Sequence, residues 1–166
     1  MKKTKLLFID VDGTLTRGDV IYTQSGEEIK KFNIKDGLAL SVWNNKLGRI
    51  SAIVTGRECE IVKKRASELG IQYVYMGVRD KGIVVREILK KSGVQTKECA
   101  CIGDDVNDLP MFKLIAQSYA PKDCASGVRH RVKKILKSKG GKGAVREMIE
   151  DILHKEKDNE LAKYFS

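Results

Sequence analysis

The sequence contains few prolines, few aromatic residues and no long apolar run. Among 166 residues there are two prolines and ten aromatic residues. This scarcity argues against a Pro-rich linker, and no apolar run approaches the roughly 20 residues that a membrane-spanning helix needs. The N-terminal residues lead straight into a short apolar run, unlike a secretory signal peptide. We therefore expect a cytoplasmic protein that makes no contact with a membrane.

The chain also lacks paired cysteines. It has four cysteines, and no two of them are spaced as Cys-x-x-Cys. Cys99 and Cys101 lie in an apolar run, where free thiols behave as small hydrophobic residues. This distribution argues against structural disulfides and against a zinc site.

The composition is that of a globular protein with an excess of positive charge. Residues are 42% hydrophobic and 33% charged, and the formal net charge is +10. We expect one domain over residues 1–155 and a polar tail over 156–166. Seven cations lie between Arg129 and Lys142. Such a field attracts sugar phosphates and nucleic acids, and a solvated basic face explains it equally well. Because basic and aromatic residues are not interleaved, nucleic acid is the less favoured partner.

Two aspartates follow the first apolar run. Residues 6–9 predict a strand buried on both faces, and the run ends at Asp10 and Asp12, followed by Gly13. Strand alternation points both carboxylates the same way, and Gly13 allows a sharp turn behind them. An Asp-Gly pair alone is an ordinary turn. Two neighbouring anions, however, need a cation or a proton between them, and carboxylate oxygens suit Mg²⁺.

Strand-like and helix-like segments alternate along the rest of the chain. The further strands are expected at residues 49–54, 72–76, 99–102 and 117–120. The helices are expected at residues 36–48, 58–69, 80–91 and 144–153. This alternation predicts an α/β fold, a Rossmann-like doubly wound parallel sheet with helices on both faces. Residues 19–33 predict a β-hairpin flap beside the first strand, and residues 137–143 are flexible by composition.

Polar clusters follow these predicted strands. Thr55-Gly56-Arg57 follows the second, Asp80-Lys81 the third, and residues 103–108 the fourth. Because parallel sheets bind ligands at the carboxyl ends of their strands, we expect one active site there. A lone Thr or Lys in such a position is usually a turn former or a solvated charge. Three carboxylates within residues 103–108 cost stability unless a cation is bound, which favours a functional site.

Taken together, these motifs resemble those of the haloacid dehalogenase superfamily of phosphotransferases. The resemblance implies that Asp10 is the nucleophile that forms an aspartyl-phosphate, and that Asp12 is the general acid and base. It also implies that Thr55 and Lys81 bind the phosphate that is transferred. A phosphatase with these four catalytic residues is therefore expected.

The same resemblance implies a Mg²⁺ cofactor and a site without a cap. The implied metal ligands are Asp10, the backbone carbonyl of Asp12, and Asp104, with Asp105 and Asp108 as auxiliary carboxylates. No insertion long enough for a cap domain separates the motifs. We therefore expect a capless enzyme, whose site accepts a large substrate or is covered by a neighbouring subunit.

Further motifs narrow the resemblance to one family. Residues 26–33, Asp36-Gly37 and residues 140–147 resemble 3-deoxy-D-manno-octulosonate 8-phosphate phosphatases. The resemblance implies hydrolysis of that sugar phosphate to the free acid sugar and phosphate, in lipopolysaccharide precursor synthesis. It also implies a homotetramer, in which the glycine-rich segment at residues 140–143 of one subunit reaches the active site of the next.

Two arginines bear on the choice of substrate. An acid sugar needs a cation for its carboxylate, which an arginine fork supplies well. The resemblance implies that Gly56, Arg57 and Arg65 bind the substrate. In relatives that act on nine-carbon ulosonic acid 9-phosphates, Glu tends to replace Arg57 and Lys tends to replace Glu68. The eight-carbon substrate is therefore favoured over this alternative, and a nucleic-acid-binding or scaffolding protein on the same fold is the third interpretation.

Overall fold

The computed structural model describes residues 3–157 and 161–165. Its centre is a six-stranded sheet in the order β5-β4-β1-β6-β7-β8, with every neighbouring pair parallel. The strands are β1 (Leu6–Ile9), β4 (Ile50–Val54), β5 (Tyr73–Tyr75), β6 (Cys99–Ile102), β7 (Gln117–Ala120) and β8 (Lys134–Ile135). The predicted parallel α/β fold is confirmed, and no cap domain occurs within these described ranges.

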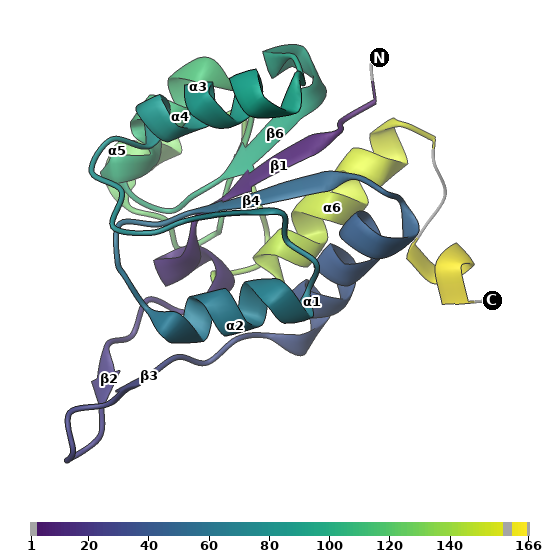
Figure 1. The fold of residues 1–166 in the computed structure, drawn as a ribbon. Coiled ribbons are helices and arrows are strands. Elements are labelled where there is room, and N and C mark those ends of the chain that lie inside the picture. Colours follow the sequence, from purple (N-terminus) through teal and green to yellow (C-terminus); the bar gives the residue numbers. More distant parts are fainter. Residues whose placement is uncertain (1–2, 158–160, 166) are drawn as a thin grey trace.

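Helices cover both faces of the sheet (Figure 1). Those on one face are α3 (Lys81–Ser92), α4 (Leu109–Leu114) and α5 (Ser126–Arg129). Those on the other are α1 (Ile34–Ser41), α2 (Glu60–Glu68) and α6 (Ala144–Lys155). No helix of the described residues has the length and apolar character needed to cross a bilayer.

Strand β1 lies in the middle of this arrangement and is buried on both sides. Leu7 and Ile9 pack with the core of α1 and α6, whereas Leu6 and Phe8 pack with the core of α3 and α4. All four side chains are fully buried, as a continuous apolar run predicts for a central parallel strand. This packing fixes where the strand ends, and therefore where Asp10 lies.

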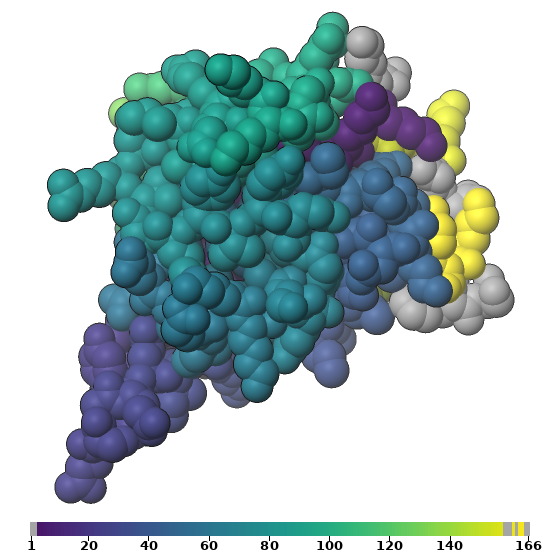
Figure 2. Space-filling model, viewed as in Figure 1, coloured from purple at the N-terminus to yellow at the C-terminus, as the bar shows by residue number. Residues whose placement is uncertain are grey.

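A β-hairpin projects from the body of the molecule (Figures 1 and 2). Its strands β2 (Ile21–Tyr22) and β3 (Glu28–Ile29) pair antiparallel, as predicted for residues 19–33. Several of its apolar side chains are exposed, namely Val20, Ile21, Tyr22 and Ile29. The hairpin follows the β1 loop directly in sequence, so its base lies beside the end of β1.

Several predicted boundaries need correction. Helix α1 begins at Ile34, two residues before the predicted start, because the Asn33 side chain accepts a hydrogen bond from the Lys35 N–H and caps the helix. Strand β8 was not predicted, since it has two residues and lies in the basic stretch. In the predicted polar tail, Leu161 is buried against the core, while residues 158–160 and 166 lie outside the described residues.

Candidate active site

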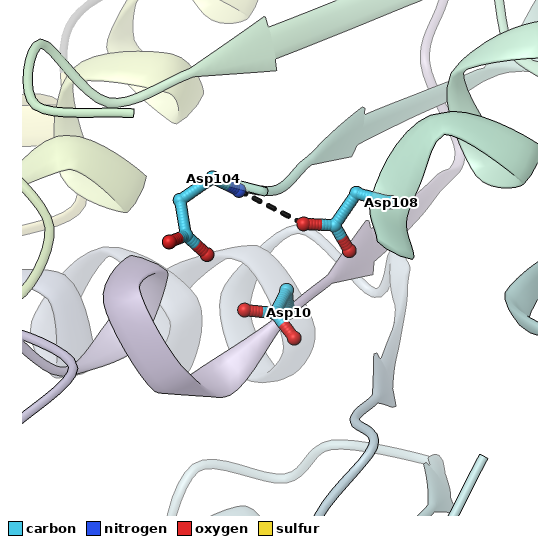
Figure 3. Close-up of side chains that lie close together, drawn as sticks. All are labelled: Asp10, Asp104 and Asp108. Atoms are coloured by element: carbon cyan, nitrogen blue, oxygen red, sulfur yellow. Dashed lines mark hydrogen bonds between the residues drawn. The ribbon is translucent and has the colours of Figure 1, made fainter. Parts of the chain in front are cut away.

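Three aspartates meet at the carboxyl end of the sheet (Figure 3). Asp10 follows β1, and Asp104 and Asp108 follow β6, the strand paired with β1. One carboxylate oxygen from each lies within 4.8 Å of the others. The backbone N–H of Asp104 donates to Asp108 Oδ2 at 2.9 Å, which holds the loop after β6 in place. The structure therefore brings together the carboxylates that follow β1 and β6.

Lys81 is the cation of this cluster. It is the first residue of α3, and its Nζ lies 2.5 Å from Asp10 Oδ1 and 2.5 Å from Asp108 Oδ1. The Lys81 side chain is 1% exposed. Burial alone lowers its pKa, but the charges of Asp10 and Asp108 outweigh burial and raise the pKa, so the ammonium stays protonated.

One lysine does not balance three carboxylates. Burial, followed by the charge of Asp108, raises the pKa of Asp10 well above its usual range, although Lys81 opposes the rise. Burial and Asp108 also raise the pKa of Asp104, to about 6. Oxygen ligands with an excess of negative charge are the donor set that Mg²⁺ binds. The cluster therefore fits a divalent cation, which Asp10 and Asp104 would hold.

Asp105 and Asp12 do not join the cluster. The Asp105 side chain accepts a hydrogen bond from the Val106 N–H at 2.7 Å and caps the turn that precedes α4. Its predicted auxiliary role therefore has no support in the geometry, whereas Asp108 lies within the cluster. The Asp12 carboxylate instead pairs with Lys30 of the hairpin. Gly13, at φ +91°, turns the chain directly behind Asp12, as predicted.

Thr55 directly follows strand β4, which lies on the opposite side of β1 from β6. It is 1% exposed, and its backbone is held on both sides: its N–H donates to the Tyr75 carbonyl, and its carbonyl accepts from the Val78 N–H. Because Ile53 pairs with Ile9 in the sheet, Thr55 lies beside the end of β1. The structure thus places a fixed hydroxyl next to the strand that carries Asp10.

The two arginines lie in different surroundings. The Arg57 side chain is 42% exposed, and its Nη2 lies 3.0 Å from Glu28 Oε1 of the hairpin. Arg65 pairs with Glu68 at 3.1 Å and lies over the ring of Phe32 at 5.8 Å. Among the described residues 3–157, neither arginine forms an ion pair with Asp10, Asp104 or Asp108. Gly56 is the third residue predicted to bind substrate. A Cβ at this position would lie 3.6 Å from the Val78 carbonyl oxygen, which is an ordinary van der Waals distance.

Comparisons with known proteins agree with this geometry. A family model for haloacid dehalogenase-like hydrolases matches residues 74–149. A 3-deoxy-D-manno-octulosonate 8-phosphate phosphatase from Haemophilus influenzae is 36% identical over 153 residues, which are 92% of this chain and 84% of that protein. The chain belongs to the family of 3-deoxy-D-manno-octulosonate 8-phosphate phosphatases. The resemblance seen in the motifs is therefore confirmed.

Solved structures of this family share the fold. The phosphatase from Moraxella catarrhalis, determined with a magnesium ion, a phosphate ion and a KDO molecule, is 38% identical with a TM-score of 0.87, and the match covers 91% of this chain and 86% of that one. A cobalt-bound phosphatase from H. influenzae is 36% identical with a TM-score of 0.86, and the match covers 92% of this chain and 88% of that one. Both relatives bind a metal ion, and the carboxylate cluster of this chain offers the oxygen ligands that such an ion needs.

In this octulosonate 8-phosphate phosphatase family member, the glycine-rich segment at residues 140–143 is ordered. The Gly141 N–H donates to the Thr14 carbonyl at 2.9 Å, and the Gly140 N–H donates to Asp123 Oδ1 at 3.0 Å. A Cβ on Gly140 would lie 1.8 Å from the Gly13 carbonyl oxygen. The predicted flexibility was wrong, because close backbone packing fixes the segment against the turn of its own active site.

The family motifs contain residues whose roles the sequence did not reveal. Asp36 is 1% exposed, and its carboxylate accepts the N–H groups of Gly143 and Arg146 at the start of α6. Lys30 pairs with Asp12 from the hairpin. Asp36 and Lys30 both lie in the motifs that resemble the family. Their position in these motifs was the only sign in the sequence that they have a role. Their partners are 18 to 110 residues away, so local spacing could not identify them.

Proposed function

We propose that this protein hydrolyses 3-deoxy-D-manno-octulosonate 8-phosphate to the free acid sugar and phosphate, through an aspartyl-phosphate on Asp10. The observation that carries the proposal is the buried cluster of Asp10, Lys81, Asp104 and Asp108 at the carboxyl end of β1, in a chain of this family. The reaction would serve lipopolysaccharide precursor synthesis in the cytoplasm, as the family membership suggests.

In the first step, a carboxylate oxygen of Asp10 forms a bond to phosphorus while the bond from phosphorus to the sugar oxygen breaks. Asp12 donates a proton to that leaving oxygen. In the second step, water attacks the phosphorus of the aspartyl-phosphate, Asp12 takes a proton from the water, and the Asp10 carboxylate is released. Asp12 therefore returns to its starting state.

The remaining residues of the site would bind the transferred phosphate and the cation that neutralises its charge. Lys81 and the Thr55 hydroxyl would bind phosphate oxygens; the contact of Lys81 with Asp10 and the burial of Thr55 support this role. Asp10 and Asp104, with the Asp12 carbonyl, would hold Mg²⁺, which supplies neutralisation of the charge on the phosphate oxygens when it is bound. Asp108 holds Lys81 and the backbone of Asp104 in position.

Arg57 is the better supported of the two predicted carboxylate-binding residues. It is partly exposed beside the hairpin that starts from the active-site loop, so its guanidinium is available to a bound ligand. Arg65 lines a hollow with Phe32, Ile34 and Lys64, and its guanidinium packs against Gly37. We propose Arg57, with the backbone of Gly56, as the main site for the sugar carboxylate and Arg65 as a secondary cation.

The protein is also proposed to form a homotetramer. The exposed apolar side chains of the hairpin, Val20, Ile21, Tyr22 and Ile29, support association between copies, because apolar patches of this kind are commonly buried in interfaces. A site without a cap also gains cover from a neighbouring subunit. Sedimentation of the wild type and of a Tyr22→Ser, Ile29→Ser variant tests this, since only the wild type should sediment as a tetramer.

Phosphate release from two substrates tests the proposed specificity. The assay compares the octulosonate 8-phosphate with a nine-carbon ulosonic acid 9-phosphate, each with Mg²⁺. We expect kcat/KM to be at least about tenfold higher for the eight-carbon substrate, a difference of about 1.4 kcal/mol in transition-state binding. A higher kcat/KM for the nine-carbon substrate would keep the mechanism and overturn the role given to Arg57.

A further inference from the structure

Lys30 combines a hairpin position with a buried side chain. It follows β3 directly, on an element that projects from the body of the protein. Its side chain is nevertheless only 2% exposed. Its Nζ contacts Asp12 Oδ1 and lies 3.1 Å from Glu28 Oε1. The base of the hairpin is therefore joined to the active-site loop through one buried ammonium group.

Burying this charge is costly unless it is closely paired. A lysine ammonium loses several kcal/mol of hydration when it leaves water, and partners recover that cost only in good geometry. A hydrophobic side chain would fill the same space without the cost. The placement of Lys30 against the carboxylate of Asp12 is therefore better explained by a role in the site than by stability.

Glu28 extends the connection. Its Oε1 accepts from both Lys30 Nζ, at 3.1 Å, and Arg57 Nη2, at 3.0 Å. The Glu28 carboxylate of the hairpin thus pairs with Lys30 and links Lys30 to Arg57. Asp12 itself lies in a turn with non-helical backbone angles, and its side chain is 25% exposed. Without Lys30, the Asp12 carboxylate would be free to rotate toward solvent.

We propose that Lys30 is a positioning residue that holds the Asp12 carboxylate in the orientation needed for proton transfer, so that the hairpin supplies part of the catalytic machinery. The inference rests on the proposed function, in which Asp12 transfers the protons. A general acid must lie within hydrogen-bond reach of the leaving oxygen, and a displacement of about 1 Å costs about 100-fold in rate.

The first test is a set of single substitutions. Lys30→Met should lower kcat by about 10- to 100-fold with Mg²⁺ and change KM by less than about threefold, because orientation and not binding is lost. Lys30→Arg keeps the charge and should restore part of kcat. Lys31→Met is the matched control, since Lys31 is exposed on the same segment, and its kcat should equal that of the wild type.

The second test is a double-mutant cycle with Asp12→Asn. If Lys30 acts through Asp12, Lys30→Met should change the residual kcat of the Asp12→Asn protein by less than about twofold. A structural role would lower kcat by the same factor in both backgrounds, and that result would overturn the proposal. An unchanged kcat in the single Lys30→Met variant would also overturn it. Circular dichroism of each variant checks that it is folded.

Both tests are run on the octulosonate 8-phosphate and on p-nitrophenyl phosphate. Activity on the aryl phosphate alone would show that the proposed substrate is wrong, and the cycle would still decide the role of Lys30. Activity on the sugar phosphate with additive effects would leave the proposed function standing and refute the role of Lys30. Activity on neither would contradict both.

Discussion

Replacing Asp104 with Asn should make the metal-free protein more stable while it removes Mg²⁺-dependent activity. Burial and the Asp108 carboxylate raise the pKa of Asp104 to about 6, against a usual value of 3.8. The folded state therefore binds this proton more tightly than the unfolded state does. As pH rises from about 4 through 6, the folded protein must ionise a disfavoured group, so its stability falls.

The size of the effect follows from the two pKa values. A difference of about 2 pH units corresponds to about 3 kcal/mol. The Asp104 side chain is partly exposed, so solvent screening reduces this to about 1.5 kcal/mol. For a chain of this length, that stability corresponds to a rise in Tm of about 3 to 6 °C for Asp104→Asn at pH 7.5.

The assay is thermal unfolding in EDTA at pH 4.5 and pH 7.5, followed by the same scan with Mg²⁺. We expect the variant to be more stable than the wild type at pH 7.5 and to differ from it much less at pH 4.5, where the folded Asp104 carboxyl is protonated. Saturating Mg²⁺ should stabilise the wild type by about 2.7 kcal/mol at 100 times Kd and the variant much less. Asp105→Asn is the matched control: Asp105 lies outside the cluster and raises the pKa of Asp104 less than burial and Asp108 do, so its effect should be smaller, and Asn caps a turn as well as Asp.

The reasoning would be refuted if Asp104→Asn lowered the Tm of the metal-free protein at pH 7.5, or if Asp105→Asn raised it equally. The first result would mean that Asp104 gains more from its contacts than it loses to burial. The second would mean that the overall charge of the loop, and not the cluster, sets the stability.

Two further substitutions test the site and its support. Lys81→Met leaves Asp10 and Asp108 buried without their cation, so the metal-free protein should lose about 3 to 5 kcal/mol of stability at pH 7.5. The loss should be smaller at low pH, because burial and Asp108 raise the pKa of Asp10 and so favour its neutral form. Denaturant unfolding in EDTA measures this loss. Gly140→Ala places a Cβ 1.8 Å from the Gly13 carbonyl oxygen, so kcat should fall and stability should drop by about 1 to 3 kcal/mol.

Gly140→Ala has a control variant, and Lys81→Met is compared at two pH values. Gly93→Ala meets no neighbouring atom but has φ +69°, so it should cost about 1 kcal/mol of stability without a loss of kcat. An unchanged kcat in Gly140→Ala would show that the glycine-rich segment does not support the turn. Equal destabilisation by Lys81→Met at pH 4.5 and 7.5 would show that lost packing, and not unpaired charge, is the cause.

The sequence predicted the sheet well where burial is complete. The bounds of β1 and β6 match the expected residues 6–9 and 99–102, because fully buried strands are continuous apolar runs. Parallel pairing then places Asp10 and Asp104 at the same edge, so two motifs 94 residues apart predicted one cluster. The proximity of Asp10 and Asp104 could therefore be predicted from the apolar pattern of the strands and the topology of the sheet.

Contacts that depend on tertiary placement were not accessible in this way. Lys30 reaches Asp12 only because the hairpin folds back along the active-site loop. Gly140 packs on Gly13, although a glycine- and lysine-rich composition is typical of flexible chain. In both cases, a contact between residues far apart in the sequence sets the conformation of the segment, and the composition of the segment does not predict that contact.

The most direct test of the account is phosphate release from 3-deoxy-D-manno-octulosonate 8-phosphate by the wild type and by Asp10→Asn, each with Mg²⁺ and with EDTA. We predict rapid release by the wild type with Mg²⁺, and a loss of at least about 100-fold both in EDTA and in the variant, because the nucleophile and the cation are each required. A folded Asp10→Asn protein that kept full Mg²⁺-dependent activity would contradict the central claim.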